Sequence, residues 1–279
     1  MRKLLTDDVV FAESPRWHRD RLWFSDVYDF ALKTVDLDGN VQVVTPVPGR
    51  PAGLGVLPDG NMLLATAIEG RIYSVSEAGA TSTVADLSAR VTGLLNDMVV
   101  DSSGRAYVGD TGFHTTRGDP FQPGCMFLVI PGQEPEVVAE DVHLPNGCAI
   151  TADGRTLYVA ETAADRISRF AIADDGRLSG RAIHVELPSA PDGLCLDAEG
   201  ALWVALPHAG EFVRIEAAGA IVERLESPFR LALTCVLGGP DRGLLFLSSA
   251  DTTLERVRKG DSRGRIDVLS VPTPGAGLP

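Results

Sequence analysis

Four oxygen-bearing side chains stand at equivalent places in a pattern that repeats along the chain. Each lies about eleven residues before a pair of apolar residues; they are Glu13, Asn96, Asn146 and Asp192. Two carboxylates and two amides gathered in a narrow space would leave charge unpaired unless a cation joined them. Such hard oxygens predict one divalent ion, with Ca²⁺ favoured and Mg²⁺, Mn²⁺ or Zn²⁺ left open.

The repeat consists of a polar turn followed by an apolar pair. Six pairs lie 40, 44, 51, 45 and 43 residues apart: Trp23-Phe24, Leu63-Leu64, Tyr107-Val108, Tyr158-Val159, Trp203-Val204 and Phe246-Leu247. Around Trp203, for example, "GLCLD" precedes the turn and the alternating stretch "GEFVRIE" follows the pair. Apolar alternation between tight turns predicts strands. Each unit of about 46 residues therefore has the size of a four-stranded propeller blade.

Six such units account for the whole chain. We therefore predict an all-β fold, a six-bladed β-propeller with four antiparallel strands per blade, in a single domain spanning residues 1–279. The third stretch of the last blade is interpreted as "LERVRKG" at 254–260. The ring is expected to close when "RIDVLSV" at 265–271 meets "DVVFAE" at 8–13, because closure removes exposed sheet edges. An open β-sandwich array is the alternative, although sandwiches lack so long a period.

In a propeller the innermost strands border a central channel, and their first residues cluster at one end of it. The four oxygen donors are therefore expected to converge there. The dipeptides "ND", "NG" and "DG" that contain three of them also occur in ordinary turns. However, "DSSG", "ADG" and "DAEG" already supply the turns of these blades. Their common phase thus favours a site over three separate turns.

Loops near the same end hold further candidates. His114 and His143 are predicted to reach a substrate, with exposed histidines of no function as the alternative. Segment 111–124 is the longest insertion between strands, so a lid and a plain surface excursion both stay open. Asp110 and Glu161 end their predicted strands and are interpreted as hydrogen-bonding or surface groups.

Composition excludes several classes of protein. With 38 acidic and 25 basic residues the net charge is −13, which disfavours a nucleic-acid-binding face. The start, "MRKLLTDDVV", has no apolar run suited to a signal peptide, and no stretch resembles a membrane span, so a cytoplasmic location is expected. Four separated cysteines indicate neither a zinc knuckle nor a disulfide framework. Nothing in the sequence indicates an oligomeric state.

Four segments resemble the SMP-30/gluconolactonase/luciferin-regenerating-enzyme family: "ESPRW" at 13–17, "LNDMVVDSSGRAYVGD" at 95–110, "LPNGCAITADGRTLYVAET" at 144–162 and "PDGLCLDAEGALWVA" at 191–205. The resemblance covers essentially the whole chain and implies a six-bladed propeller with a divalent metal in its channel. It further implies that Glu13, Asn146 and Asp192 bind the metal and that Asp192 doubles as general base. Asn96 would bind the metal through water or contact the substrate.

One departure from the family pattern bears on the substrate. Members that act on sugar lactones tend to carry an arginine where this chain has Leu94. We therefore expect Leu94 at the rim of the pocket, and a lactone or other ester with fewer hydroxyl groups as the small-molecule partner. The leading hypothesis is metal-dependent lactone hydrolysis with Asp192 as base. A phosphotriesterase on the same metal site and a non-catalytic binding scaffold are the alternatives.

Overall fold

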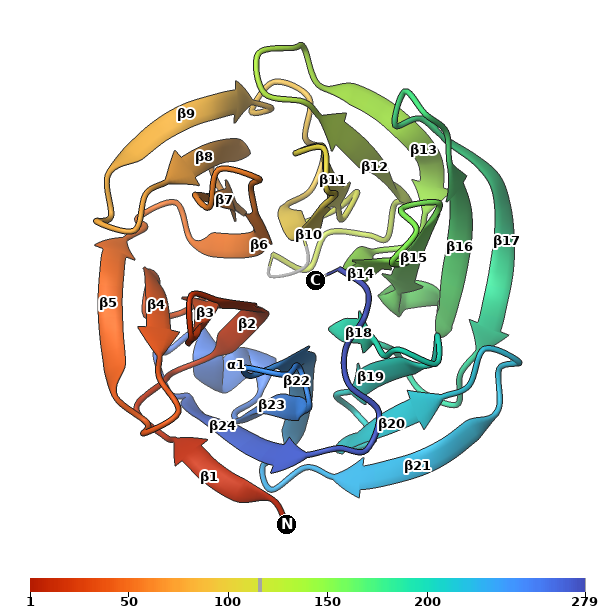
Figure 1. Cartoon of the computed structure of the whole chain (residues 1–279). Helices are drawn as coiled ribbons and strands as arrows, with labels where there is room; N and C mark the ends of the chain where they lie inside the picture. The colour runs from red at the N-terminus through yellow and green to blue at the C-terminus, as the bar shows by residue number, and fades with distance from the viewer. Residues whose placement is uncertain (115–116, 279) are drawn as a thin grey trace.

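The computed structural model describes residues 1–114 and 117–278 and consists almost entirely of β-strands. The strands form six four-stranded antiparallel sheets, arranged as blades around a central axis (Figure 1). The predicted six-bladed β-propeller is thereby confirmed.

Five blades are continuous stretches of chain, each counted from the channel outward. The first comprises β2 (Ala12–His18), β3 (Arg21–Asp26), β4 (Ala31–Val35) and β5 (Val41–Pro46). The second comprises β6 (Pro51–Val56), β7 (Met62–Thr66), β8 (Arg71–Val75) and β9 (Thr81–Asp86). The third comprises β10 (Leu95–Val100), β11 (Ala106–Asp110), β12 (Gly124–Val129) and β13 (Glu136–Val142). The fourth comprises β14 (Pro145–Ile150), β15 (Thr156–Glu161), β16 (Arg166–Ile172) and β17 (Leu178–Glu186), and the fifth β18 (Leu194–Leu196), β19 (Leu202–Leu206), β20 (Glu211–Ile215) and β21 (Ile221–Glu226).

The sixth blade joins the two ends of the chain. Its strands are β22 (Leu231–Gly238), β23 (Leu244–Asp251), β24 (Arg263–Ser270) and, outermost, β1 (Lys3–Thr6). Closure by N- and C-terminal strands is therefore confirmed, but the expected partner at 8–13 is wrong. Those residues lead inward from the outermost strand to β2, and Val9 packs in the core on the way.

The third strand of the sixth blade also differs from the prediction. Residues 254–260 contain the helix α1 (Leu254–Val257), and β24 takes the place expected for them. Leucine, glutamate and arginine are good helix formers, and Gly260, at a φ of 74°, ends the turn by donating its N–H to the carbonyl of Val257. In the described part of the chain, no helix has the length and apolar character that a bilayer span requires.

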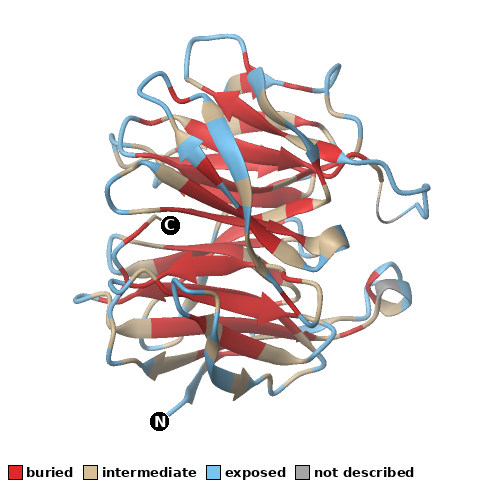
Figure 2. Cartoon of the chain, turned by 90° about the vertical axis from the view of Figure 1, so that its right-hand side faces the viewer, coloured by how far each residue is buried: buried red, intermediate tan, exposed pale blue. Residues whose placement is uncertain are grey.

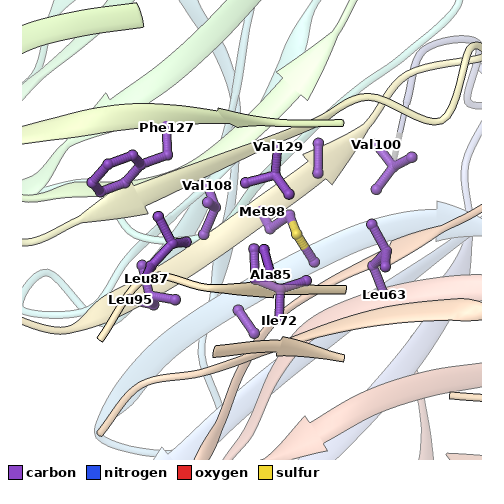
Figure 3. Packing of buried hydrophobic residues seen from close by; sticks show 12 residues of the cluster. Leu63, Ile72, Ala85, Leu87, Leu95, Met98, Val100, Val108, Phe127 and Val129 are labelled. Carbon is purple, nitrogen blue, oxygen red and sulfur yellow. The ribbon is translucent and has the colours of Figure 1, made fainter. Parts of the chain in front are cut away.

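Apolar side chains fill the space between neighbouring blades. Between the second and third blades, Leu63 packs in one buried cluster with Met98, Val108 and Phe127 (Figure 3). The second strands are buried on both faces, so they form continuous apolar runs in the sequence. The outermost strands are largely exposed (Figure 2), which explains why their apolar pattern is faint.

Each inner strand is irregular where it begins. Register shifts interrupt the pairing of β2, β6, β10, β14 and β22 with their second strands, within the first few residues. In the fifth blade β18 starts only at Leu194, and Asp192 precedes it with its N–H donated to the carbonyl of Ala205 at 2.9 Å. Bulges of this kind redirect side chains beside binding sites. Here they lie at the level of the four oxygen donors.

Glycines allow the inner strands to approach one another at this level. A Cβ on Gly53 would lie 2.5 Å from the backbone N of Met98, and one on Gly147 would lie 2.4 Å from the carbonyl oxygen of Asp192. A Cβ on Gly193 would lie 2.0 Å from Oγ1 of Thr234. None of the three has a positive φ. The turn interpretation of "NG" and "DG" is therefore wrong, because these glycines serve close strand packing.

The C-terminal tail crosses the opposite end of the channel. Leu278 forms a β-bridge with Ile150, the last residue of β14, and Gly275 forms one with Asp197. The chain accordingly ends close to the axis in Figure 1. The tail thus lies away from the end where the inner strands begin.

We expect Gly147→Ala to lower the free energy of unfolding by about 1–3 kcal/mol, the usual cost of overpacking. The added methyl group would meet backbone atoms, which cannot turn aside. Urea denaturation measures the effect. Gly243→Ala is the matched control, because its Cβ would meet only the flexible carboxyl end of Asp241. Equal losses in the two variants would contradict the assigned role of Gly147.

Candidate functional site

A pocket of about 210 Å³ opens at the end of the channel where the inner strands begin. Its wall includes all four predicted oxygen donors: Glu13 from β2, Asn96 from β10, Asn146 from β14 and Asp192 from just before β18. Ala52 of β6 lies on the same wall. The structure therefore brings the four residues together, although they come from four different blades.

Both amide groups are held so that their oxygens stay available. Nδ2 of Asn96 donates to the carbonyl of Pro145 at 3.1 Å, and Nδ2 of Asn146 donates to Oγ1 of Thr162 at 3.2 Å. Each amide thereby uses an N–H on the protein, and its carbonyl oxygen is the atom left to accept from a ligand or to bind a cation. The donor set thus comprises two carboxyl groups and two amide oxygens.

No described residue forms an ion pair with the carboxyl group of Glu13 or of Asp192. Burial, followed by the charges of Asp192 and Asp97, raises the pKa of Glu13 well above its usual value. Burial and the charge of Asp97 also raise the pKa of Asp192 to about 7, although a hydrogen bond from Asn146 opposes this. The surrounding protein therefore disfavours both negative charges, and a cation in the pocket would relieve this cost. The residues present fit a divalent ion.

Asp97, Arg16 and Ser14 form a buried network behind the site. Oδ1 of Asp97 accepts from Oγ of Ser14 at 2.7 Å and from the guanidinium of Arg16 at 3.1 Å. The ion pair with Arg16 compensates Asp97 directly. We did not predict this network from the sequence. One signal in the sequence could have indicated it. In two blades the residue directly after the oxygen donor is glycine, whereas in the first and third blades this residue is Ser14 or Asp97.

Buried carboxylates hold the segments that enter three inner strands. Asp26 accepts from the backbone N–H of Phe11 at 2.7 Å, and Asp110 accepts from that of Gly93 at 2.9 Å. Glu161 accepts from the backbone N–H of His143 at 3.0 Å. Asp110 and Glu161 are therefore hydrogen-bonding groups, and the surface alternative is wrong for both.

Hydroxyl groups tie two of these blades, the first and the fourth, to the next one. Oγ of Ser25 donates to the carbonyl of Ala52 at 2.6 Å, and Oγ1 of Thr162 donates to that of Pro191 at 2.8 Å. Because Ala52 and Pro191 lie at or beside the level of the oxygen donors, these bonds fix the spacing of the inner strands around the pocket.

The rim of the pocket is formed by the residues that immediately precede four inner strands. These are Phe11, Arg50, Leu94 and Leu144. Leu94 is buried and lines the pocket, in the location expected from the sequence. Three of the four rim side chains are apolar, and Arg50 carries the one charge among them.

The two candidate histidines lie beside residues of the pocket rather than on its wall. Burial and nearby charges, including that of Arg50, lower the pKa of His114. His143 directly precedes Leu144 of the pocket wall. Among the described residues that line the pocket, neither His114 nor His143 is present. The ring of His143 packs edge-on against Phe121 at a centroid distance of 5.2 Å, and its Nε2 lies 3.3 Å from a carboxylate oxygen of Asp141. Within segment 111–124, residues 115 and 116 lie outside the described residues, and the lid interpretation stays a prediction.

Two other features bear on the chemistry. Residues 260–264 match the GxSxG pattern of serine hydrolases, but Ser262 lies between α1 and β24 rather than at a strand-to-helix turn, and its hydroxyl donates to the carbonyl of Val10 at 2.8 Å.

No group of three or more His, Cys, Asp or Glu side chains able to hold a metal occurs among the described residues. A metal site at the pocket therefore depends on the amide oxygens of Asn96 and Asn146 as well as on carboxylates.

The ionisation of Glu161 makes the stability of the fold around the site depend on pH. Burial alone would raise the pKa of this carboxyl, but hydrogen bonds from Arg166, Ser168, the His143 backbone and Arg181 outweigh it and lower the pKa to about 2. The charged form is therefore stabilised by folding. Its contribution is fully present above the ordinary value of 4.5 and is lost as the pH falls toward 2.

We expect Glu161→Gln to destabilise the protein most at neutral pH. The difference from wild type should shrink by about 3 kcal/mol between pH 6 and pH 2, because only wild type loses the ionised carboxylate over this range. Urea midpoints measured across the range test this. The exposed Glu223→Gln variant is the control, and a difference that stays constant with pH would contradict the assignment.

Comparison with known proteins supplies the family. The chain matches the family model described as SMP-30/Gluconolactonase/LRE-like region over residues 11–251. It is 28% identical over 247 residues to a pentonolactonase of Haloferax volcanii, covering 86% of this chain and 81% of the relative. It is 24% identical to a 6-deoxy-6-sulfogluconolactonase of Pseudomonas putida, covering 97% and 94%.

Solved structures share the fold. A calcium-binding protein, regucalcin, from Agrobacterium tumefaciens superposes with a TM-score of 0.85 at 22% identity, covering 99% of this chain and 95% of that one. A gluconolactonase from Xanthomonas campestris gives a TM-score of 0.78 at 22% identity, covering 100% and 89%. With the family model matched over most of its length, the chain belongs to the SMP-30/gluconolactonase/LRE-like family, as the resemblance of its motifs implied.

Proposed function

We propose that this protein is a lactonase that opens a cyclic ester with water and uses one divalent metal ion. The observation that carries the proposal is the meeting of two carboxyl groups and two amide oxygens on one pocket wall. Relatives named as lactonases of sugar acids support the reaction class. We also propose that residues 1–279 act as a single domain and that the protein works in the cytoplasm.

Glu13, Asn146 and Asp192 would hold the metal, with Asn96 beside them. Their oxygen-only donor set favours Ca²⁺, with Mg²⁺, Mn²⁺ or Zn²⁺ as the alternatives. The raised pKa values of Glu13 and Asp192 support a cation here, because two buried carboxyl groups otherwise lack positive charge. A related solved structure is described as a calcium-binding protein, which supports the same choice.

When bound, a divalent ion supplies Lewis-acid polarisation of an ester carbonyl and lowers the pKa of water. Asp192 would accept a proton from the attacking water and return it to the ring oxygen. The water oxygen bonds to the carbonyl carbon, the acyl–oxygen bond breaks, and the product is a hydroxy acid. Asn96 would orient the substrate, while Phe11, Leu94 and Leu144 would surround the apolar part of its ring.

A lactone panel with metal control tests the proposal. We expect acid release from lactones to disappear after chelation and dialysis and to return with Ca²⁺, because the proposed reaction needs a divalent ion to polarise the ester carbonyl. Because three of the four rim side chains are apolar, γ-butyrolactone should open faster than gluconolactone. Faster opening of the sugar lactone would contradict the expected substrate. Cleavage of a phosphotriester without lactone cleavage would favour the phosphotriesterase alternative, and retention of no divalent ion would favour a binding scaffold.

We expect Asp192→Asn to lower kcat by about 10²–10⁴-fold, the usual contribution of a positioned general base. The amide keeps an oxygen for the metal, so much of the metal affinity should remain. Steady-state kinetics and calorimetric metal titration measure the two effects separately. The exposed Asp174→Asn variant should behave as wild type, whereas full activity in Asp192→Asn would remove this residue from the mechanism.

A further inference from the structure

Arg50 places a guanidinium group on the pocket wall, where no described residue forms an ion pair with it. The side chain lines the pocket, and the guanidinium carbon lies 5.8 Å from the centre of the Tyr28 ring. Its Nε is buried and has no hydrogen-bond acceptor among the described residues. The contact with Tyr28 is a cation–π interaction, so it does not use the guanidinium N–H groups as hydrogen-bond donors, and these groups can donate to a ligand.

Three other arginines with little exposure form ion pairs with carboxylates. Arg16 contacts Asp97 at 3.1 Å, Arg166 contacts Glu161 at 2.8 Å and Arg214 contacts Asp197 at 2.6 Å. Burial lowers the pKa of Arg50, and only Tyr28 opposes this, so no carboxylate of the described residues compensates its charge. Removing a cation from water without a counter-ion costs free energy. At the paired arginines the carboxylate offsets this free-energy cost, whereas at Arg50 no carboxylate of the described residues does so.

The backbone at Arg50 also adopts an uncommon conformation. Its φ is 63°, in the left-handed region that residues with a Cβ seldom occupy. Two backbone hydrogen bonds hold it there, from its N–H to the carbonyl of Val47 at 3.1 Å and from the N–H of Ala67 to its carbonyl at 2.9 Å. Strained residues persist where the surrounding structure requires them, commonly at ligand sites.

The neighbours of Arg50 define what a ligand must offer. Phe11, Leu94 and Leu144 occupy the equivalent rim positions of three other blades and are apolar. Phe11 and Tyr28 pack edge to face at a centroid distance of 5.2 Å, so Arg50 lies beside an aromatic surface. A matching ligand therefore has a compact apolar body and an anionic group on one side.

We propose that Arg50 determines substrate specificity by binding a carboxylate carried on the lactone, so that the substrate class is a small lactone ring with a carboxylate substituent. The inference rests on the proposed lactonase function. A guanidinium matches a carboxylate with two parallel N–H···O bonds, which lysine or an amide cannot reproduce. The scissile ester would lie toward Asp192 and the carboxylate toward Arg50, and the rim residues would enclose the ring between them.

A matched pair of substrates tests this role. The probes are γ-butyrolactone bearing a γ-carboxylate and the same ring bearing a γ-carboxamide, which is nearly equal in shape but neutral. Wild type should prefer the carboxylate. We expect Arg50→Gln to lower kcat/KM for the carboxylate by about 10–100-fold, chiefly through KM, since a charge-assisted bidentate contact is lost. The rate for the carboxamide should change by less than about twofold.

Two further variants sharpen the result. Arg50→Lys keeps the charge but not the two parallel donors, and it should retain only part of the preference. Arg155→Gln removes one positive charge from an exposed turn in another blade and should leave the preference intact. Arg50→Gln should unfold at the same temperature as wild type or higher, because it removes a partly buried charge that forms no ion pair with a described residue.

The outcomes separate this inference from the proposed function. If wild type opens both lactones and Arg50→Gln changes their rates equally, the role of Arg50 is refuted and the lactonase proposal stands. If wild type opens neither, the lactonase proposal fails, and calorimetric binding of the two probes decides the role of Arg50. Binding of the carboxylate that weakens at least tenfold in Arg50→Gln would then support it, and equal binding by the two proteins would overturn it.

Discussion

The close approach of six inner strands around one axis is the constraint on which this structure depends. The strands can lie so near one another only because Gly53, Gly147 and Gly193 present no Cβ to the neighbouring backbone or side chain. Bulges at the same level redirect the adjacent side chains. In two of these blades the oxygen donor directly precedes the glycine. The same close approach of the strands therefore both requires the glycine and places the donor at the pocket.

Charged side chains behind the ring of inner strands have partners of opposite charge, whereas those on the pocket wall do not among the described residues. Behind it, Asp97 is satisfied by Arg16 and Ser14, and farther out Glu161 is satisfied by Arg166 and Arg181. These pairs hold the framework. On the pocket wall the carboxyl groups of Glu13 and Asp192 and the guanidinium of Arg50 have no such partners among the described residues. These partly buried charges, which no described residue compensates, support the proposed sites for a metal ion and a substrate.

Much of the fold and of the donor set could be predicted because both follow from a period. Buried second strands recur at a nearly even spacing, and residues at one phase of a closed ring must meet. The errors occur where local pattern competes with long-range pairing. Residues 254–260 were expected to form a strand but contain α1, and the three-residue spacing of Leu254 and Val257 suits a helix. The apolar residues at 9–12 lead into the core and to β2 rather than pairing with β24. The period did not place the two histidines, and neither is among the described residues that line the pocket.

The linear pattern of turns and apolar pairs was thus sufficient for the six blades, for their closure by both chain ends and for the four oxygen donors, since these depend only on spacing. Three other properties needed the folded coordinates. The network of Asp97 with Ser14 and Arg16 joins the first and third blades, the glycines act through contacts between blades, and Arg50 is unusual only because no partner lies near it. Pairing and its absence are relations between residues far apart in the chain, and only tertiary packing decides which of them come into contact.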